Sequence, residues 1–99
     1  MALKVRFTRR AQSDIAKIRV HILQHDQAAA ERVRRAVVAS IVRLSEHGLI
    51  GRQSELPGVR IKLVPRYPFK IYYRATPDSV QILHVRHTAR REPDPGEVI

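Results

Sequence analysis

Positive side chains crowd one part of the chain, the stretch from Gly58 to Arg91, in which Asp78 is the only carboxylate. Guanidinium and ammonium groups bind phosphates and carboxylates. A segment with this balance of charge is therefore typical of a surface that meets a polyanion or an acidic protein. The residues that we expect to contact such a target are Arg60, Lys62, Arg66, Arg74, Arg86, His87, Arg90 and Arg91.

Some of the same residues could cleave RNA without a metal ion. That reaction needs a base for the 2′-hydroxyl, an acid for the leaving 5′-oxygen and cations around the phosphorane. Glu55 or His87 could be the base, His87 or an arginine could be the acid, and Arg60, Lys62 and Arg74 could hold the phosphate. The catalytic set of a ribonuclease would thus be Glu55, Arg74 and His87. The alternative for His87 is structural, a hydrogen bond from its ring to a backbone carbonyl, and both interpretations stay open.

The other histidines do not indicate a metal or cofactor site. His21, His25 and His47 lie at the flanks or ends of predicted helices without the spacing of ligands, whereas a zinc site needs three or four convergent groups. His84 lies inside a predicted strand and is interpreted as a structural histidine. The few glycines are scattered, so no phosphate-cradling loop is predicted. We therefore expect no bound metal and no cofactor.

Composition restricts the setting of the protein. Its 99 residues suffice for one domain with a modest core, and 19 Lys and Arg against 9 Asp and Glu give a formal net charge of +10. The absence of cysteine excludes disulfides and fits a reducing compartment. The first residues lack the features of a signal peptide, and no apolar run approaches the roughly 20 residues that span a bilayer. We expect a soluble protein of the bacterial cytoplasm without membrane contact.

A short strand and two amphipathic helices are predicted in the first half. Apolar and basic residues alternate over residues 2–7, and Thr8 then stands where a helix N-cap is expected. The apolar stripe of this helix, which runs to about Gln24, is Ala11, Ile15, Ile18 and Ile22, while Gln12, Asp14, Lys17 and Arg19 should be solvated. Asp26 can cap a second helix that continues to about His47 and stops at Gly48. Its stripe is Val33, Val37, Ile41 and Leu44, widened by Ala30, Val38 and Val42.

Three strands are predicted in the second half, over about 59–64, 68–75 and 79–86, after a loop over residues 49–57. The order predicts an α+β fold, β-α-α-β-β-β, in which a helical hairpin packs on one face of a mainly antiparallel four-stranded sheet. Residues 1–91 would form a single domain, followed by an acidic, proline-rich tail over residues 92–99 that is irregular or ordered only by a partner. Since the helices need the apolar face, the residues expected on the opposite side or its rim are Arg60, Lys62, Lys70, Tyr72 and Arg74.

Four segments resemble the RelE/ParE toxin superfamily, and two of them its ParE-like branch. Phe7 to Ile15 resembles the entry from the first strand into the first helix. Gly51-Arg52 with Glu55-Leu56 resembles a loop of the ParE branch, and so does the Tyr-Pro step of Arg66 to Arg74. The residues Ile82 to Arg91 resemble the last strand, with its histidine and paired basic residues. The resemblance covers residues 3–91 in the expected order of elements.

The resemblance implies the toxin of a type II toxin–antitoxin pair, held inactive by an antitoxin. ParE-like members poison DNA gyrase and block replication, whereas RelE-like members cut mRNA on the ribosome. This chain lacks the C-terminal tyrosine and the lysine-rich approach of the nucleases, so the gyrase alternative is favoured. A basic nucleic-acid-binding module without toxicity is the third alternative.

The expected partner is an acidic antitoxin, similar to ParD and of the ribbon-helix-helix type, in a hetero-oligomer that alone reaches operator DNA. By analogy at the level of the fold, the residues expected to bind it are Ile22, Leu23, Leu49 and Ile50.

Overall fold

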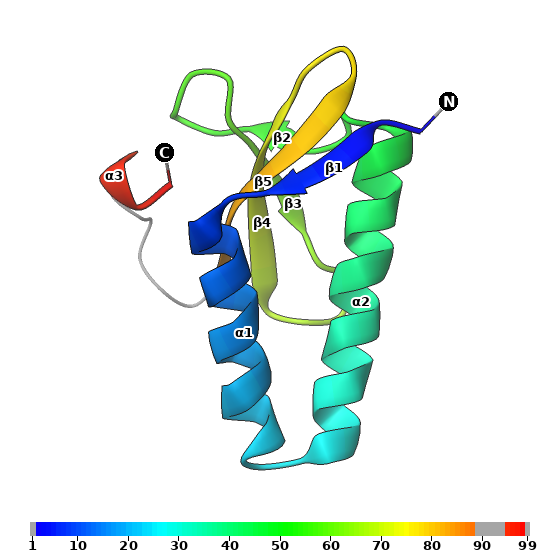
Figure 1. Cartoon of the computed structure of the whole chain (residues 1–99), viewed down its shortest axis with the longest axis vertical. Coiled ribbons are helices and arrows are strands. Elements are labelled where there is room, and N and C mark those ends of the chain that lie inside the picture. The colour runs from blue at the N-terminus through cyan, green and yellow to red at the C-terminus, as the bar shows by residue number, and fades with distance from the viewer. Residues whose placement is uncertain (1, 89–94, 99) are drawn as a thin grey trace.

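The computed structural model describes residues 2–88 and 95–98. Figure 1 shows two long helices beside a twisted sheet, with a short C-terminal helix on the other side. Along the chain the elements are β1 (Lys4–Phe7), α1 (Arg9–Leu23), α2 (Gln27–Glu46), β2 (Arg52–Gln53), β3 (Arg60–Leu63), β4 (Phe69–Ala75), β5 (Ser79–His87) and α3 (Pro95–Val98). In the part of the chain described, no helix has the length and apolar character needed to cross a membrane.

Both predicted helix caps are confirmed. The Thr8 hydroxyl accepts a hydrogen bond from the Ala11 N–H at 3.1 Å, and the Asp26 carboxylate accepts from the N–H groups of Ala28 and Ala29 at 2.9 and 3.2 Å. Each cap satisfies amide groups that the first helical turn leaves without a partner. The short connection over residues 24–26 lets α1 and α2 lie side by side as a hairpin (Figure 1).

The sheet has five strands in the order β1-β5-β4-β3-β2. β1 pairs with β5 in parallel, and the other neighbours are antiparallel. The predicted fold class is confirmed, but the predicted number of four strands is wrong. The additional strand is β2, inside the predicted loop, where Arg52 and Gln53 pair with Ile61 and Arg60. A strand of two residues is too short to produce an alternating pattern in the sequence.

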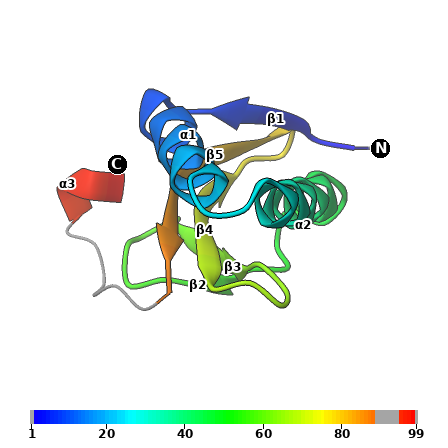
Figure 2. The ribbon, with the colours of Figure 1, turned by 90° about the horizontal axis from the view of Figure 1, so that it is seen from below.

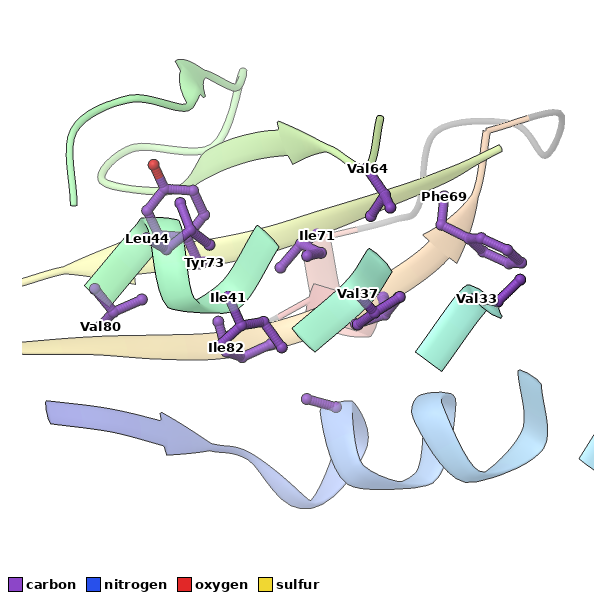
Figure 3. Close-up of a cluster of buried hydrophobic side chains, with 12 residues drawn as sticks. Val33, Val37, Ile41, Leu44, Val64, Phe69, Ile71, Tyr73, Val80 and Ile82 are labelled. Atoms are coloured by element: carbon purple, nitrogen blue, oxygen red, sulfur yellow. The ribbon is translucent and has the colours of Figure 1, made fainter. Parts of the chain in front are cut away.

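The main core lies between the helical hairpin and one face of the sheet (Figures 2 and 3). The predicted stripes of both helices enter it, and the strands contribute Val64, Phe69, Ile71, Tyr73, Val80, Ile82 and Val85. The predicted width of the α2 stripe is partly wrong. Ala30 is buried, but the side chains of Val38 and Val42 are 45% and 50% exposed.

A second, smaller core on the other face of the sheet determines which side chains of β3 face the helices. Val59 and Ile61 pack there with Tyr72, Leu83 and Val98. Because directly paired residues point to the same face, and Arg60 pairs with Tyr73 and Lys62 with Ile71, these two basic residues share the helix-facing side. The expectation that Arg60 and Lys62 lie opposite the helices with Lys70 and Arg74 is therefore wrong.

The end of the chain is more regular than expected. Residues 95–98 form one helical turn, and the Val98 side chain is 4% exposed against the second core. The prediction of an irregular tail is thus wrong for these four residues.

Gly51 lies where no side chain fits. A Cβ atom there would lie 2.5 Å from the Tyr73 hydroxyl oxygen and 2.8 Å from the Ile61 carbonyl oxygen. The Gly51 N–H donates to that hydroxyl at 2.8 Å, so this contact cannot open without losing a buried hydrogen bond. We expect Gly51→Ala to lower the free energy of unfolding by about 1–3 kcal/mol, measured by urea denaturation. Gly58→Ala is not a suitable control because its φ is +74°, whereas Gly96→Ala, with open space around it, should change much less.

Candidate functional site

A buried carboxylate and a buried histidine meet between α1 and β5. The Asp14 side chain is hydrogen-bonded through Oδ2 to Nδ1 of His84 and to the Val85 N–H, the latter at 3.1 Å. Its other oxygen, Oδ1, accepts from Nε of Arg10 at 3.1 Å. The whole residues Asp14 and His84 are 9% and 2% exposed. The bonds to His84 and Val85 join α1 to β5, which among the described residues has no neighbouring strand on that side beyond its pairing with β1.

The hydrogen-bond partners define the tautomer of His84. A guanidinium group only donates, and Nη1 of Arg86 lies 3.4 Å from Nε2 of His84. Nε2 is therefore the acceptor, and Nδ1 carries the proton that it donates to Asp14. Burial raises the pKa of the Asp14 carboxyl, but the hydrogen bonds from His84 and Val85 and the favourable electrostatic interactions with His84 and Arg10 together bring that pKa below its ordinary value.

The prediction that Asp14 is solvated is wrong, while the structural interpretation of His84 is confirmed. α1 continues along β5 where β1 ends, because the Thr8 N–H donates to the Ile82 carbonyl at 3.0 Å and the Thr8 hydroxyl donates to the Leu83 carbonyl at 3.0 Å. Asp14 then takes the place of a neighbouring strand for the Val85 N–H. A bulge leaves Leu83 unopposed between the pairs Tyr73–Ile82 and Tyr72–His84, which brings the His84 ring 5.7 Å from the Tyr72 ring.

Positive side chains surround this buried pair in a hollow of about 480 Å³ between α1 and β5. We call it the cationic hollow. Apolar side chains of Ile18, Ile22 and Phe69 form part of its wall. Its positive or protonatable side chains are Arg10, Lys17, His21, Arg86 and His87. A second hollow of about 400 Å³ shares Arg10 with the first and is also lined by Thr8, Arg74 and Gln81.

The three predicted catalytic residues of a ribonuclease do not meet. Arg74 pairs with Gln81 near one end of β4, and His87 pairs with Phe69 at the other end. Five residues of strand separate them, about 17 Å at 3.3 Å per residue. They also lie on opposite faces, since Phe69 belongs to the main core and Arg74 follows Tyr72 of the second core at a spacing of two. Glu55 is exposed in the loop between β2 and β3.

The other predicted target residues are distributed over several surfaces. Arg60 donates to the carbonyl of Gly51 at 2.8 Å, and Lys62 to that of Leu63 at 2.9 Å. Arg66 is exposed in the turn before β4, with a φ of +72°. Arg86 and His87 line the cationic hollow, and Arg90 and Arg91 lie outside the described residues. The predicted target residues that the structure describes thus do not form the single basic surface that the sequence predicted.

The predicted antitoxin contacts form two separate groups. Ile22 and Leu23 lie at the end of α1, and Leu49 and Ile50 follow the far end of α2. The 20 residues of α2 between them span about 30 Å. Leu23, Leu49 and Ile50 are 41%, 70% and 41% exposed, whereas Ile22 packs partly against the main core.

Val38 and Val42 extend the second group along α2. They are one helical turn apart and half exposed, on the half of α2 that leads to Leu49 and Ile50. We call Val38, Val42, Leu49 and Ile50 the apolar strip. The helical period places both valines at the margin of the apolar stripe of this helix. Their exposure could have been predicted, since the stripe of Val33, Val37, Ile41 and Leu44 is complete without them.

Among the described residues, no three His, Asp or Glu side chains are arranged to hold a metal ion.

Comparison with known proteins assigns this arrangement to a family. Residues 5–92 match the model of the ParE toxin of the type II toxin–antitoxin system, parDE. The chain belongs to the ParE toxin family. The predicted membership of the RelE/ParE superfamily is thereby confirmed, and the protein is the toxin component of a type II toxin–antitoxin system.

Relatives of this ParE-family toxin include both branches of the superfamily. Toxin RelE3 of Caulobacter vibrioides is 29% identical over 84 residues, which is 83% of this chain and 90% of that protein. A chain of the chromosomal ParDE system from P. aeruginosa superimposes with a TM-score of 0.77 at 27% identity, covering 87% of this chain and 96% of that one.

Two RelE-type structures are also similar. A chain of the RelBE2 toxin–antitoxin complex from Mycobacterium tuberculosis gives a TM-score of 0.61 at 26% identity, covering 88% of this chain and 99% of that one. A variant of E. coli toxin RelE in the free state gives 0.60 at 15% identity over 90% of this chain and 86% of that one. The latter likeness concerns the fold alone.

Proposed function

We propose that this ParE-family toxin arrests growth in the bacterial cytoplasm by binding DNA gyrase and blocking replication, and not by cutting RNA. The observation that carries the proposal is the separation of Glu55, Arg74 and His87. Acid–base cleavage needs its groups within hydrogen-bond reach of one phosphate, and about 17 Å of strand between Arg74 and His87 prevents this. The higher TM-score with the ParDE chain than with either RelE-type chain supports the same choice.

We further propose that an acidic, ribbon-helix-helix antitoxin similar to ParD neutralises the toxin by covering the apolar strip in a hetero-oligomer. An exposed apolar surface on α2 suits the apolar face of a partner helix. The formal net charge of +10 would attract an acidic partner and raise the rate of association at low salt. Operator DNA would then be bound through the antitoxin.

Two assays on the purified protein separate the proposed mechanism from RNA cleavage. In the first, gyrase supercoils relaxed plasmid in the presence of increasing toxin, and we expect inhibition with accumulation of cleaved DNA. In the second, mRNA on translating ribosomes is mapped by primer extension, and we expect no new ends. In cells, expression should give filaments and DNA damage before translation falls.

Glu55→Ala is the informative variant, because Glu55 is exposed and lies outside both hollows. We expect it to retain full activity in the gyrase assay and in cells. Intact supercoiling together with new mRNA ends that disappear in Glu55→Ala would instead establish the nuclease and overturn the proposal.

A further inference from the structure

The side chains that line the cationic hollow carry a net positive charge even though one of them is a carboxylate. Asp14 is the only carboxylate among its lining residues. Its two oxygens already accept hydrogen bonds from Arg10, His84 and Val85. Arg10 uses Nε for this bond and its side chain is 50% exposed. The terminal nitrogens of a guanidinium bound in this way can still bind a second acceptor.

The second hollow continues the positive charge past the start of α1. The first turn of α1 contains Arg9 and Arg10 and no acidic residue. Positive side chains at this end of a helix are unfavourable because the helix dipole is positive there. Asp14 offsets this for Arg10, and a bound anion would offset it further. Arg74 also lines this hollow, and its Nε is buried without a hydrogen-bond partner among the described residues.

The two hollows lie along α1, which runs beside β5, and they share Arg10. Thr8 lines the second hollow and His21 the first, and the 13 residues of helix between them extend about 20 Å. One strand of B-DNA carries a phosphate every 3.4 Å of its axis, so 20 Å corresponds to about six base pairs. We propose that α1 and the adjoining side chains of β4 and β5 form a binding track for the backbone of duplex DNA. Its charged members are Arg10, Lys17, Arg74 and Arg86.

The composition of the track favours a duplex over other anions. A single strand is bound mainly by stacking its bases on exposed aromatic rings, but Phe69 in the hollow wall is 7% exposed. An acidic protein segment is the alternative that the test must exclude, because Ile18, Ile22 and Phe69 place apolar side chains beside the charges of the first hollow. Phosphate contacts carry no sequence information, so the track would not recognise an operator.

The salt dependence of DNA binding tests the proposal. Affinity of the purified toxin for a fluorescent 20-base-pair duplex would be measured by anisotropy. Four phosphate contacts predict a slope of log K against log [salt] of about −3.6, so a fourfold rise in salt weakens binding about 150-fold. In Arg10→Ala/Lys17→Ala the slope should fall to about −1.8, and the same rise in salt should weaken binding only about 12-fold.

A charge-matched control distinguishes the track from general basicity. Arg32→Ala/Arg43→Ala removes the same charge from exposed positions of α2 and should keep the original slope. Because Arg10 also supports Asp14, Lys17→Glu and Arg32→Glu form a second matched pair that spares this contact. In that pair only Lys17→Glu should weaken DNA binding.

The result that would overturn the track is equal weakening by both members of a pair, or no binding of duplex at low salt. Equal or tighter binding of a single strand, of RNA or of poly-glutamate, lost in the same variants, would also overturn it, since another ligand would then occupy the surface. The assay contains no gyrase, and the inference goes beyond the proposed target. A toxin that leaves gyrase unaffected could still pass this test.

Discussion

Asp14→Ala is expected to lower the free energy of unfolding by about 3–5 kcal/mol, a large part of the 5–15 kcal/mol that holds a domain folded. The substitution removes the acceptor of three hydrogen bonds, two of them with the buried residues His84 and Val85. The ring N–H of His84 and the backbone N–H of Val85 would both be left buried and unsatisfied. Urea denaturation monitored by circular dichroism measures the loss.

Two comparisons identify the cause of this loss. Asp14→Asn retains one carbonyl acceptor of the same shape and should be distinctly more stable than Asp14→Ala, though less stable than the original protein. Glu46→Ala removes an exposed carboxylate at the end of α2 and should change the free energy by less than about 0.5 kcal/mol. If Asp14→Ala were no more damaging than Glu46→Ala, the buried pair would contribute nothing to stability.

The same carboxylate should make stability depend on pH in the acid range. The folded-state pKa of Asp14 lies below its ordinary value of 3.8, so the folded protein binds this proton less readily than the unfolded chain. The resulting stabilisation is complete above the unfolded pKa and is lost as the pH falls from there through the folded pKa.

The difference in stability between the original protein and Asp14→Asn reports this contribution. It should be constant near neutral pH and become smaller below about pH 4. Glu31, whose pKa is lowered to about 2 by its hydrogen bond with Arg34, is present in both proteins and cancels. A difference that stays unchanged down to the acid transition would contradict the assignment to Asp14.

The sequence predicted the helices well because their signals are local. Thr8 and Asp26 identify the helix starts through hydrogen bonds to residues two or three positions away, and the apolar stripes need only the helical period. The strands were found for the same reason. The alternation of apolar and polar residues, however, indicates that the two faces of a strand differ in polarity. It does not indicate which face packs against the helices. The second core takes Val59 and Ile61, and this reversed the expected side of Arg60 and Lys62.

The buried pair could not be predicted because it depends on contacts across 70 residues of chain. Asp14 lies just beside the apolar stripe, at the position before Ile15, where a carboxylate is ordinarily solvated. Its burial follows from the course of α1 along β5 and from the bulge at Leu83 that turns His84 toward Tyr72. Neither feature leaves a mark in the local sequence. The separation of Arg74 and His87, in contrast, follows from the β4–β5 hairpin, because Arg74 lies near its turn and His87 at its open end.

Val42→Asp is expected to weaken binding of the antitoxin about 100-fold or more while leaving the toxin folded. Val42 is 50% exposed in the middle of the apolar strip, and valine and aspartate have similar helix propensities. In the complex, however, the new carboxylate would be removed from water against an apolar side chain of a partner that is itself acidic. A cost on the order of 3 kcal/mol corresponds to about two orders of magnitude in the dissociation constant.

Val20→Asp provides the matched control, because Val20 is 57% exposed on α1 and lies outside the strip. Isothermal titration with the cognate antitoxin measures both affinities, and thermal unfolding of the free toxins verifies that both are folded. In cells, coexpressed antitoxin should rescue growth with the original toxin and with Val20→Asp but fail with Val42→Asp. Equal affinities of the two variants would place the antitoxin elsewhere on the toxin. If the Val42→Asp toxin arrests growth in the presence of its antitoxin, the antitoxin and the cellular target bind different surfaces of the toxin. Two separate surfaces are also what the proposed DNA track on α1 and β5 requires.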